Sequence, residues 1–166
     1  KTPKEVLNNI LELYHKRKFE EILKQENELI KLYPGSVDLY NIIGSTNLAL
    51  KQFRSAIGNF KKAIKINPKL PVIFYNLALS FHYDKNFESA LSSYEKAIKL
   101  NPDHADTYCN MGMSLNEKGD LKRAIKSYRK TLEINPDHIG AHYNLGAIYS
   151  KTGELNFAIK NYKKAI

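Results

Sequence analysis

A spacing of 34 residues restricts the fold of this chain more than any other feature of its sequence. Self-similarity at a fixed period of about 20 to 50 residues is typical of repeat architectures, in which each repeat is one supersecondary unit. In a chain of 166 residues, this period predicts about five stacked repeats rather than one globular core. Prolines and alanines mark the period, at Pro34, Pro68, Pro102 and Pro136 and at Ala56, Ala90, Ala124 and Ala158.

Residues 105–138 show the pattern of one repeat most clearly. They contain two runs of apolar residues spaced three or four positions apart, which predict two amphipathic helices. Gly119 and Asp120 separate the runs, because glycine tolerates the left-handed backbone of a tight turn and aspartate can cap the next helix. Asn135 and Pro136 end the unit, which is therefore a predicted helical hairpin. The apolar residues are Tyr108, Met111, Gly112 and Leu115, then Leu121, Ala124, Ile125, Tyr128, Leu132 and Ile134.

These residues and their offsets resemble the tetratricopeptide repeat family. The shared pattern is an aromatic residue, an apolar residue and glycine, a Gly-Asp turn, and then alanine, tyrosine and proline, and it covers essentially the whole chain. The resemblance implies an all-α fold, a right-handed alpha-alpha superhelix of about five helix-turn-helix repeats that forms a single solenoid over residues 1–166. The repeats would be a divergent unit at 3–36, regular units at 37–70, 71–104 and 105–138, and a truncated unit at 139–166.

The first repeat departs most from this pattern. Asn9 replaces the usual leucine, Ile10 the usual glycine and Ile22 the small alanine. We therefore expect the helices near residues 3–16 and 19–32 to cross at a greater distance or in a shifted register.

The second repeat has two departures of its own. Asn47 stands where other repeats carry an apolar or aromatic residue, so it is either a buried polar group that needs a partner or a sign of a displaced helix. Lys51 and Gln52 replace the Gly-Asp pair without changing the length of the turn, and we expect the hairpin to survive.

Small residues recur inside the predicted first helices of the repeats. Glycine inside a helix costs about 0.5–1 kcal/mol relative to alanine. Its recurrence predicts that a side chain at this position would clash with the second helix. The small residues are Gly44, Ala78, Gly112 and Gly146.

A formal net charge of +9 raises the question of nucleic-acid binding. Most of the cations fall in the last turns of predicted second helices, where they offset the helix dipole. No aromatic residues alternate with them, as a single-strand-binding surface would require. We therefore interpret them as a solvated outer face and predict no nucleic-acid partner. They include Lys61, Lys62, Lys65, Lys96, Lys99, Lys126, Arg129, Lys130, Lys160, Lys163 and Lys164.

Membrane insertion is not expected, because no apolar run approaches the roughly 20 residues that cross a bilayer. The first residues also lack the apolar core of a signal peptide.

The single cysteine, Cys109, cannot form an internal disulfide and suits a reducing compartment, so we expect a cytoplasmic protein.

The sequence contains no set of residues typical of catalysis. His138 and His142 have the spacing of two metal ligands on one helix, but His138 precedes the predicted helix and copies the loop position of His104. Cys109 has no predicted base beside it, which indicates an unreactive thiol. We therefore predict neither an enzyme nor a metal or other cofactor.

The family resemblance implies a binding surface instead. In tetratricopeptide solenoids the first helices line a concave groove, along which extended peptides or partner helices commonly lie. The corresponding groove positions in this chain are Asn41, Tyr75, Asn76, Leu79, Tyr83, Cys109, Asn110, Met113, Tyr143, Asn144 and Ala147.

Asparagine recurs at one groove position in three repeats, as Asn76, Asn110 and Asn144. This recurrence resembles the asparagine ladder of the superhelices of O-linked N-acetylglucosamine transferase and SPINDLY. Because an Asn amide both donates and accepts hydrogen bonds, it can pair with a peptide backbone whatever the peptide's sequence. The alternative is an inherited pattern, since Asn is common at this position across tetratricopeptide repeats.

We interpret the chain as a non-catalytic protein-interaction module, and we expect it to be part of a longer protein. One alternative is a substrate-recruiting arm of a larger enzyme such as a glycosyltransferase, which the full-length gene would reveal. Another is a homo-oligomeric scaffold. The last helix, Leu155 to Ile166, has an apolar face with no following repeat, so further repeats, a capping helix or end-to-end self-association would cover it.

Overall fold

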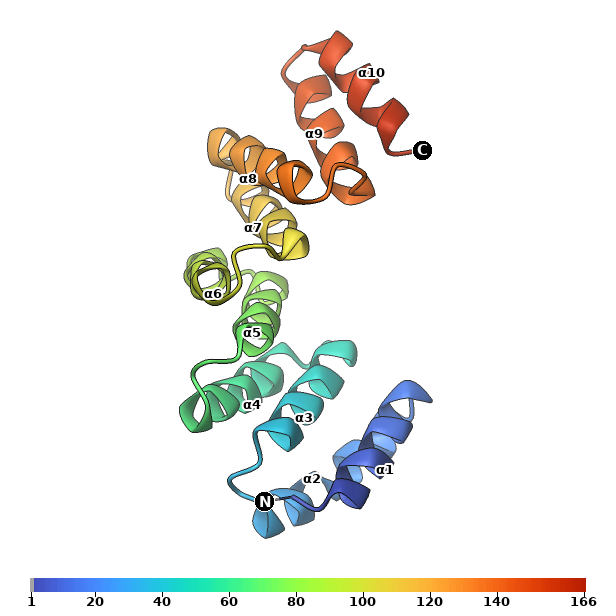
Figure 1. The fold of residues 1–166 in the computed structure, drawn as a ribbon, viewed down its shortest axis with the longest axis vertical. Helices are drawn as coiled ribbons and strands as arrows, with labels where there is room; N and C mark the ends of the chain where they lie inside the picture. The colour runs from blue at the N-terminus through green and yellow to red at the C-terminus, as the bar shows by residue number, and fades with distance from the viewer. Residues whose placement is uncertain (1) are drawn as a thin grey trace. The chain divides into compact units, whose positions relative to one another are not determined.

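The computed structural model of the protein describes residues 2–166, which form ten α-helices and no strands. Figure 1 shows the helices in chain order. Each predicted helix is present, and consecutive helices alternate as the first and second members of the expected repeats. The helices are α1 (Lys4–His15), α2 (Phe19–Leu32), α3 (Val37–Ala49), α4 (Phe53–Ile66), α5 (Pro71–Tyr83), α6 (Phe87–Leu100), α7 (Ala105–Glu117), α8 (Leu121–Ile134), α9 (Ile139–Lys151) and α10 (Leu155–Lys164).

The chain divides into two compact units at the turn that follows α5. The first unit ends at Asn86 and contains α1 to α5, and the second begins at Phe87 and contains α6 to α10. In the first unit one apolar cluster is built around Ile10 and Ile43 and another around Phe60. The second unit has a cluster centred on Leu115, Tyr128 and Leu145. Each unit therefore has a core of its own.

A glycine of the first helix touches an aromatic ring of the second helix in three hairpins. A Cβ atom at Gly44 would lie 2.7 Å from the Phe60 ring, and one at Gly112 would lie 2.6 Å from the ring of Tyr128. At Gly146 the corresponding distance to the ring of Tyr162 is 2.7 Å. Because carbon atoms do not approach this closely, the predicted clash is confirmed at these three positions.

The hairpin of α1 and α2 packs less closely than the later ones. These two helices approach each other over less of their length than α3 and α4 or α7 and α8 do. Ile22, in place of the small alanine, is fully buried among Ile10, Leu39 and Ile43. The larger side chain fills the space between the helices, so this hairpin makes the looser contact that either a greater separation or a shifted register predicts.

Asn47 is a buried polar group with a backbone partner. Its side chain is 2% exposed, and its Nδ2 donates a hydrogen bond to the carbonyl of Ile43 at 2.9 Å. The helix α3 continues past it to Ala49 without interruption. Of the two alternatives that the sequence left open, the structure therefore shows the first.

The turn inside each repeat has the same backbone conformation whether or not it contains glycine. The second residue after the first helix has a positive φ in every repeat, at Arg17, Lys51, Lys85, Gly119 and Gly153. In the second repeat the N–H of Lys51 donates to the carbonyl of Leu48, and that of Gln52 to the carbonyl of Asn47. These two bonds are a Schellman cap, which satisfies carbonyls at the end of the helix. The hairpin thus survives without the Gly-Asp pair, as expected.

Replacing Gly112 by alanine should destabilise the second unit, although alanine is the better helix former. The added methyl group must displace the buried ring of Tyr128, and overpacking of this kind costs about 1–3 kcal/mol. Gly58, inside α4, has open space where a Cβ would stand, so Gly58→Ala should stabilise by about 0.5–1 kcal/mol. Urea unfolding followed by circular dichroism measures both changes. If the two substitutions changed the free energy of unfolding equally, the close contact between Gly112 and the ring of Tyr128 would be contradicted.

Replacing Lys51 by glycine should stabilise the first unit by about 0.5–1 kcal/mol. The left-handed conformation costs an L-residue about 1–2 kcal/mol, and the greater freedom of glycine in the unfolded chain offsets part of the gain. Lys51→Ala keeps the strain and serves as the matched control, which should leave stability nearly unchanged. Gly119→Ala, in the reverse direction, should destabilise by about 1 kcal/mol. Urea unfolding would overturn this view if Lys51→Gly and Lys51→Ala behaved alike.

Candidate functional site

In the first unit, two asparagines on neighbouring first helices are hydrogen-bonded to each other. Asn76 of α5 donates from Nδ2 to Oδ1 of Asn41 in α3, at 3.2 Å, and both side chains are half-buried. This bond leaves Oδ1 of Asn76 as an acceptor and Nδ2 of Asn41 as a donor, neither of which has a hydrogen-bond partner within residues 2–166. One peptide unit of a ligand offers the complementary donor and acceptor.

Aromatic and apolar side chains continue this face along α5. Tyr75 and Leu79 are half-buried, and Tyr83 is 50% exposed. The Tyr83 ring stacks on Phe53 of α4, with ring centroids 5.7 Å apart and an interplanar angle of 21°. This contact holds one face of the tyrosine ring against the protein and leaves half of its surface open to solvent.

In the second unit, the corresponding face is formed by α7 and α9. Asn110 and Met113 of α7 are half-buried, as are Asn144 and Ala147 of α9. Tyr143 is 59% exposed, and its ring centroid lies 5.8 Å from that of Tyr162 in α10. The groove positions expected from the family resemblance thus fall on α3, α5, α7 and α9. Those of α3 and α5 belong to the first unit and those of α7 and α9 to the second.

Cys109 is a core residue more than a surface one. Its side chain is 5% exposed, lies in the apolar cluster of the second unit and is hydrogen-bonded to the side chain of Asn144. Burial raises the pKa of the Cys109 thiol to about 11, and the nearby carboxylate of Asp106 contributes to the rise. The thiol is therefore protonated at neutral pH, where it is a poor nucleophile.

The two histidines with metal-ligand spacing have separate structural roles. His138 accepts a hydrogen bond at Nδ1 from the backbone N–H of Ala141 and so caps α9, while its Nε2 pairs with Asp106 at 2.9 Å. His142 is buried, with Nε2 bonded to the carbonyl of Pro136 at 2.8 Å. Within residues 2–166, no cluster of three or more His, Cys, Asp or Glu side chains could hold a metal ion.

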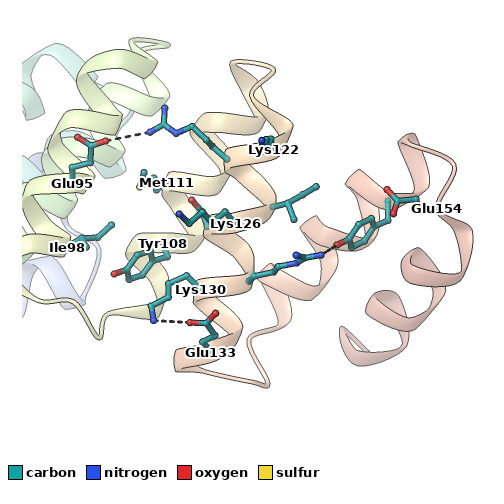
Figure 2. A pocket seen from close by; sticks show the side chains of 14 residues that line it. Glu95, Ile98, Tyr108, Met111, Lys122, Lys126, Lys130, Glu133 and Glu154 are labelled. Carbon is teal, nitrogen blue, oxygen red and sulfur yellow. Dashed lines mark hydrogen bonds and ion pairs between the residues drawn. The ribbon is translucent and has the colours of Figure 1, made fainter.

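Sequence reasoning missed a second surface, which lies around α8 in the second unit. An open groove of about 1190 Å³ lies there, lined by basic and apolar side chains from α6, α7, α8 and α9. Figure 2 shows the side chains that line it. The sequence predicts a solvated outer face for Lys126, Arg129 and Lys130, and it places Tyr108 and Met111 in the repeat pattern. Because their proximity depends on several helices at once, it cannot be read from the period of any one of them.

A signal within α8 could nevertheless have indicated this surface. Cations occupy five positions of this helix, and no other second helix carries a cation at all five corresponding positions. In α6, for example, three of the five positions hold Glu88, Ser92 and Glu95. This combination of five cationic positions is thus found in one repeat, although α4 carries four cations of its own. The five cations are Lys122, Arg123, Lys126, Arg129 and Lys130.

Helical hairpins that recur every 34 residues, with the same packing contact and the same turn, define an α-helical repeat protein. Comparison with family models identifies the kind of repeat. A TPR repeat model matches residues 112–153, and tetratricopeptide repeat models match residues 37–70, 71–104 and 93–126. The chain belongs to the tetratricopeptide repeat family.

Solved structures with the same fold include several MamA proteins. A crystal structure of MamA is 26% identical, with a TM-score of 0.85, over 93% of this chain and 90% of that chain. MamA from Desulfovibrio magneticus RS-1, from residue 41 to its end, is 19% identical over 97% of this chain and 92% of its own, with a TM-score of 0.87. These likenesses confirm the expected all-α tetratricopeptide fold of about five repeats.

YrrB, described as a TPR protein with an unusual peptide-binding site, has a TM-score of 0.78 and is 23% identical over 96% of this chain and 82% of that chain. Comparison with curated proteins gave no significant match. The helices formed by residues 2–166 are all too short or too polar to span a membrane.

Proposed function

We propose that the chain is a non-catalytic interaction module whose first helices bind an extended peptide or a partner helix. The observation that carries this proposal is the asparagine pair of the first unit. Asn76 offers an acceptor and Asn41 a donor without a partner in residues 2–166, on one half-buried face. The exposed ring of Tyr83 lies about two turns further along α5. A peptide backbone satisfies both amides, and its side chains pack on the neighbouring tyrosines and leucine.

The second unit supports the same proposal with a similar composition. Asn110 and Asn144 occupy the positions that correspond to Asn76, and the exposed Tyr143 stands beside Asn144. The recurrence of Asn at this position resembles the asparagine ladder of O-linked N-acetylglucosamine transferase. From this resemblance we expect the asparagines of this chain to bind a peptide backbone. The fold is also that of YrrB, whose description includes a peptide-binding site.

Changing Asn76, Asn110 and Asn144 together to alanine should weaken peptide binding at least about tenfold, because each amide contributes one or two hydrogen bonds to the ligand. The ligands come from selection of a random peptide library on the protein, followed by isothermal titration of the selected peptides. The triple substitution should leave the chain folded, although it removes the hydrogen bonds that join Asn76 to Asn41 and Asn144 to Cys109.

A matched control removes asparagines from second helices. Asn27→Ala in α2 and Asn156→Ala in α10 change exposed residues of the same type. They should leave peptide affinity unchanged. Equal affinities of the triple variant and the wild-type protein would show that the recurring asparagine is an inherited pattern without a role in binding.

We also propose that α10 mediates self-association with a second copy of the chain. Four large apolar side chains are exposed on or next to this short helix, namely Leu155, Phe157, Ile159 and Ile166. Phe157 is 56% exposed even though its ring packs against Tyr149, with centroids 5.4 Å apart. A cluster of exposed apolar side chains on one helix favours burial against another apolar surface.

Replacing Phe157 and Ile159 by glutamine should weaken concentration-dependent association, because both side chains are more than half exposed and contribute apolar surface to the contact. Sedimentation velocity over a range of protein concentrations measures the change. Leu32→Gln and Ile139→Gln remove equally exposed apolar residues elsewhere and should have no effect. A wild-type protein that is monomeric at all concentrations would refute the role of α10.

A further inference from the structure

The groove around α8 has an apolar floor below a basic rim. Ile98 of α6, Tyr108 and Met111 of α7, and Ile125 of α8 line it with half-buried apolar side chains. Figure 2 shows these side chains together with the lysines of α8. The groove is larger and more open than the enclosed pockets of about 300–1,000 Å³ that take small molecules. Its form suits a segment of polypeptide.

Three cations of α8 have charges that the protein does not neutralise. Lys122 and Lys126 have no carboxylate within 4.0 Å in the part of the chain that the structure describes. Arg129 donates from Nη2 to the neutral hydroxyl of Tyr149 at 2.9 Å, which orients its guanidinium without compensating the charge. These residues follow each other at spacings of four and three, so they form one stripe about 10 Å long.

Two further cations of the groove are paired with carboxylates, and the carboxylate of Glu154 accepts a hydrogen bond from the hydroxyl of Thr152 at 3.0 Å. Arg123 lies 3.7 Å from Glu95 of α6, and Lys130 lies 2.9 Å from Glu133 within α8. The groove therefore presents a row of three available cations, and its formal charge remains positive because five cations and three carboxylates line it. Such a row is complementary to a partner that carries carboxylates along one side.

The basic surface continues beyond α8 towards the C-terminal hairpin. A smaller groove of about 240 Å³ shares Arg129 and Tyr149 with the first one and adds Lys160 and Lys164 of α10. The apolar side chains of Leu132 and Phe157 also line it. The combination of cations and apolar surface thus extends across side chains of α8, α9 and α10 in the second unit.

From these observations we propose that the α8 groove binds an acidic amphipathic segment of a partner protein. Its carboxylates pair with Lys122, Lys126 and Arg129, and its apolar side chains enter between α6 and α8. This surface is formed around a second helix and is separate from the asparagine face proposed above. It is a second binding site, and its occupant is selected by charge together with apolar contact.

Two other polyanions fit the groove less well. Single-stranded nucleic acids bind by stacking bases on exposed aromatic rings, but Tyr108 is half-buried, and Tyr149 is 6% exposed and bonded to Arg129. Anionic membranes require apolar side chains that protrude from the surface, whereas Ile98, Met111 and Ile125 are themselves half-buried. Both remain as outcomes of the experiment below.

The probe for the test is a fluorescein-labelled 14-residue helical peptide with Glu on one face and Leu and Phe on the other. Fluorescence anisotropy with the whole chain should show binding that weakens as ionic strength rises. Lys122→Glu combined with Lys126→Glu should reduce affinity at least about tenfold, since two attractions become repulsions. The matched control, Lys65→Glu with Lys69→Glu, reverses two exposed charges outside the groove and should change affinity little.

Three further probes identify what the groove recognises. The same peptide with Ser in place of Leu and Phe, a 20-nucleotide oligo-dT and vesicles of phosphatidylcholine with phosphatidylserine should each bind at least about tenfold more weakly. Tight binding of the Ser peptide would reduce the site to non-specific charge attraction, and tighter binding of oligo-dT or vesicles would replace the proposed partner class. Equal affinities of the groove variant and the control variant for the acidic peptide would show that the peptide does not bind in the α8 groove.

The experiment also separates this site from the asparagine face. The variant with Asn76, Asn110 and Asn144 changed to alanine should bind the acidic probe as the wild-type protein does. Methyl resonances of Ile98, Met111 and Ile125 should shift on addition of the probe, because these groups form the floor. A loss of probe binding in the asparagine variant would show that the peptide occupies the first-helix face, and would contradict the proposal.

Discussion

The contact between a glycine in one helix and an aromatic ring in the next is the interaction on which three of the hairpins depend. At Gly44, Gly112 and Gly146 the ring occupies the place of the missing side chain, so the helix axes can approach closely. The partner ring is fully buried at Phe60 and Tyr128. Because glycine weakens a helix, the contact must supply the packing that holds the pair together. The first hairpin has isoleucines, Ile10 and Ile22, at the positions of both small residues, and its two helices pack together less closely.

Close packing of the two helices also decides which positions are available for binding. Each hairpin uses its inward faces for the core, and the turn conformation fixes the direction of the second helix. What remains are the outer faces, which carry amides and tyrosines on first helices and, in α8, cations. The repeat pattern leaves these positions unrestricted, so one repeat can acquire a charge stripe without any change in the fold.

The elements and the packing contact could be predicted from sequence because both repeat every 34 residues. The backbone partner of Asn47 could not be predicted, since the sequence was compatible with both a buried amide and a displaced helix. The positive φ of Lys51 was equally hidden, because lysine gives no sign of a left-handed turn. The candidate site was harder still. Position on a helix could not distinguish buried Cys109 from its half-buried neighbours, and the α8 groove combines side chains from helices that no single period relates.

The two proposed surfaces recognise different properties of a partner. Hydrogen bonds from Asn41 and Asn76 to a peptide backbone contribute affinity with little dependence on the peptide's sequence. The stripe of Lys122, Lys126 and Arg129 depends strongly on sequence, because a segment without carboxylates leaves three charges unpaired and a basic segment is repelled. A module with only the amide face would bind many extended chains. In this proposal the charged groove of the second unit adds the discrimination that backbone recognition lacks, because Lys122, Lys126 and Arg129 stand where α6 carries Glu88, Ser92 and Glu95.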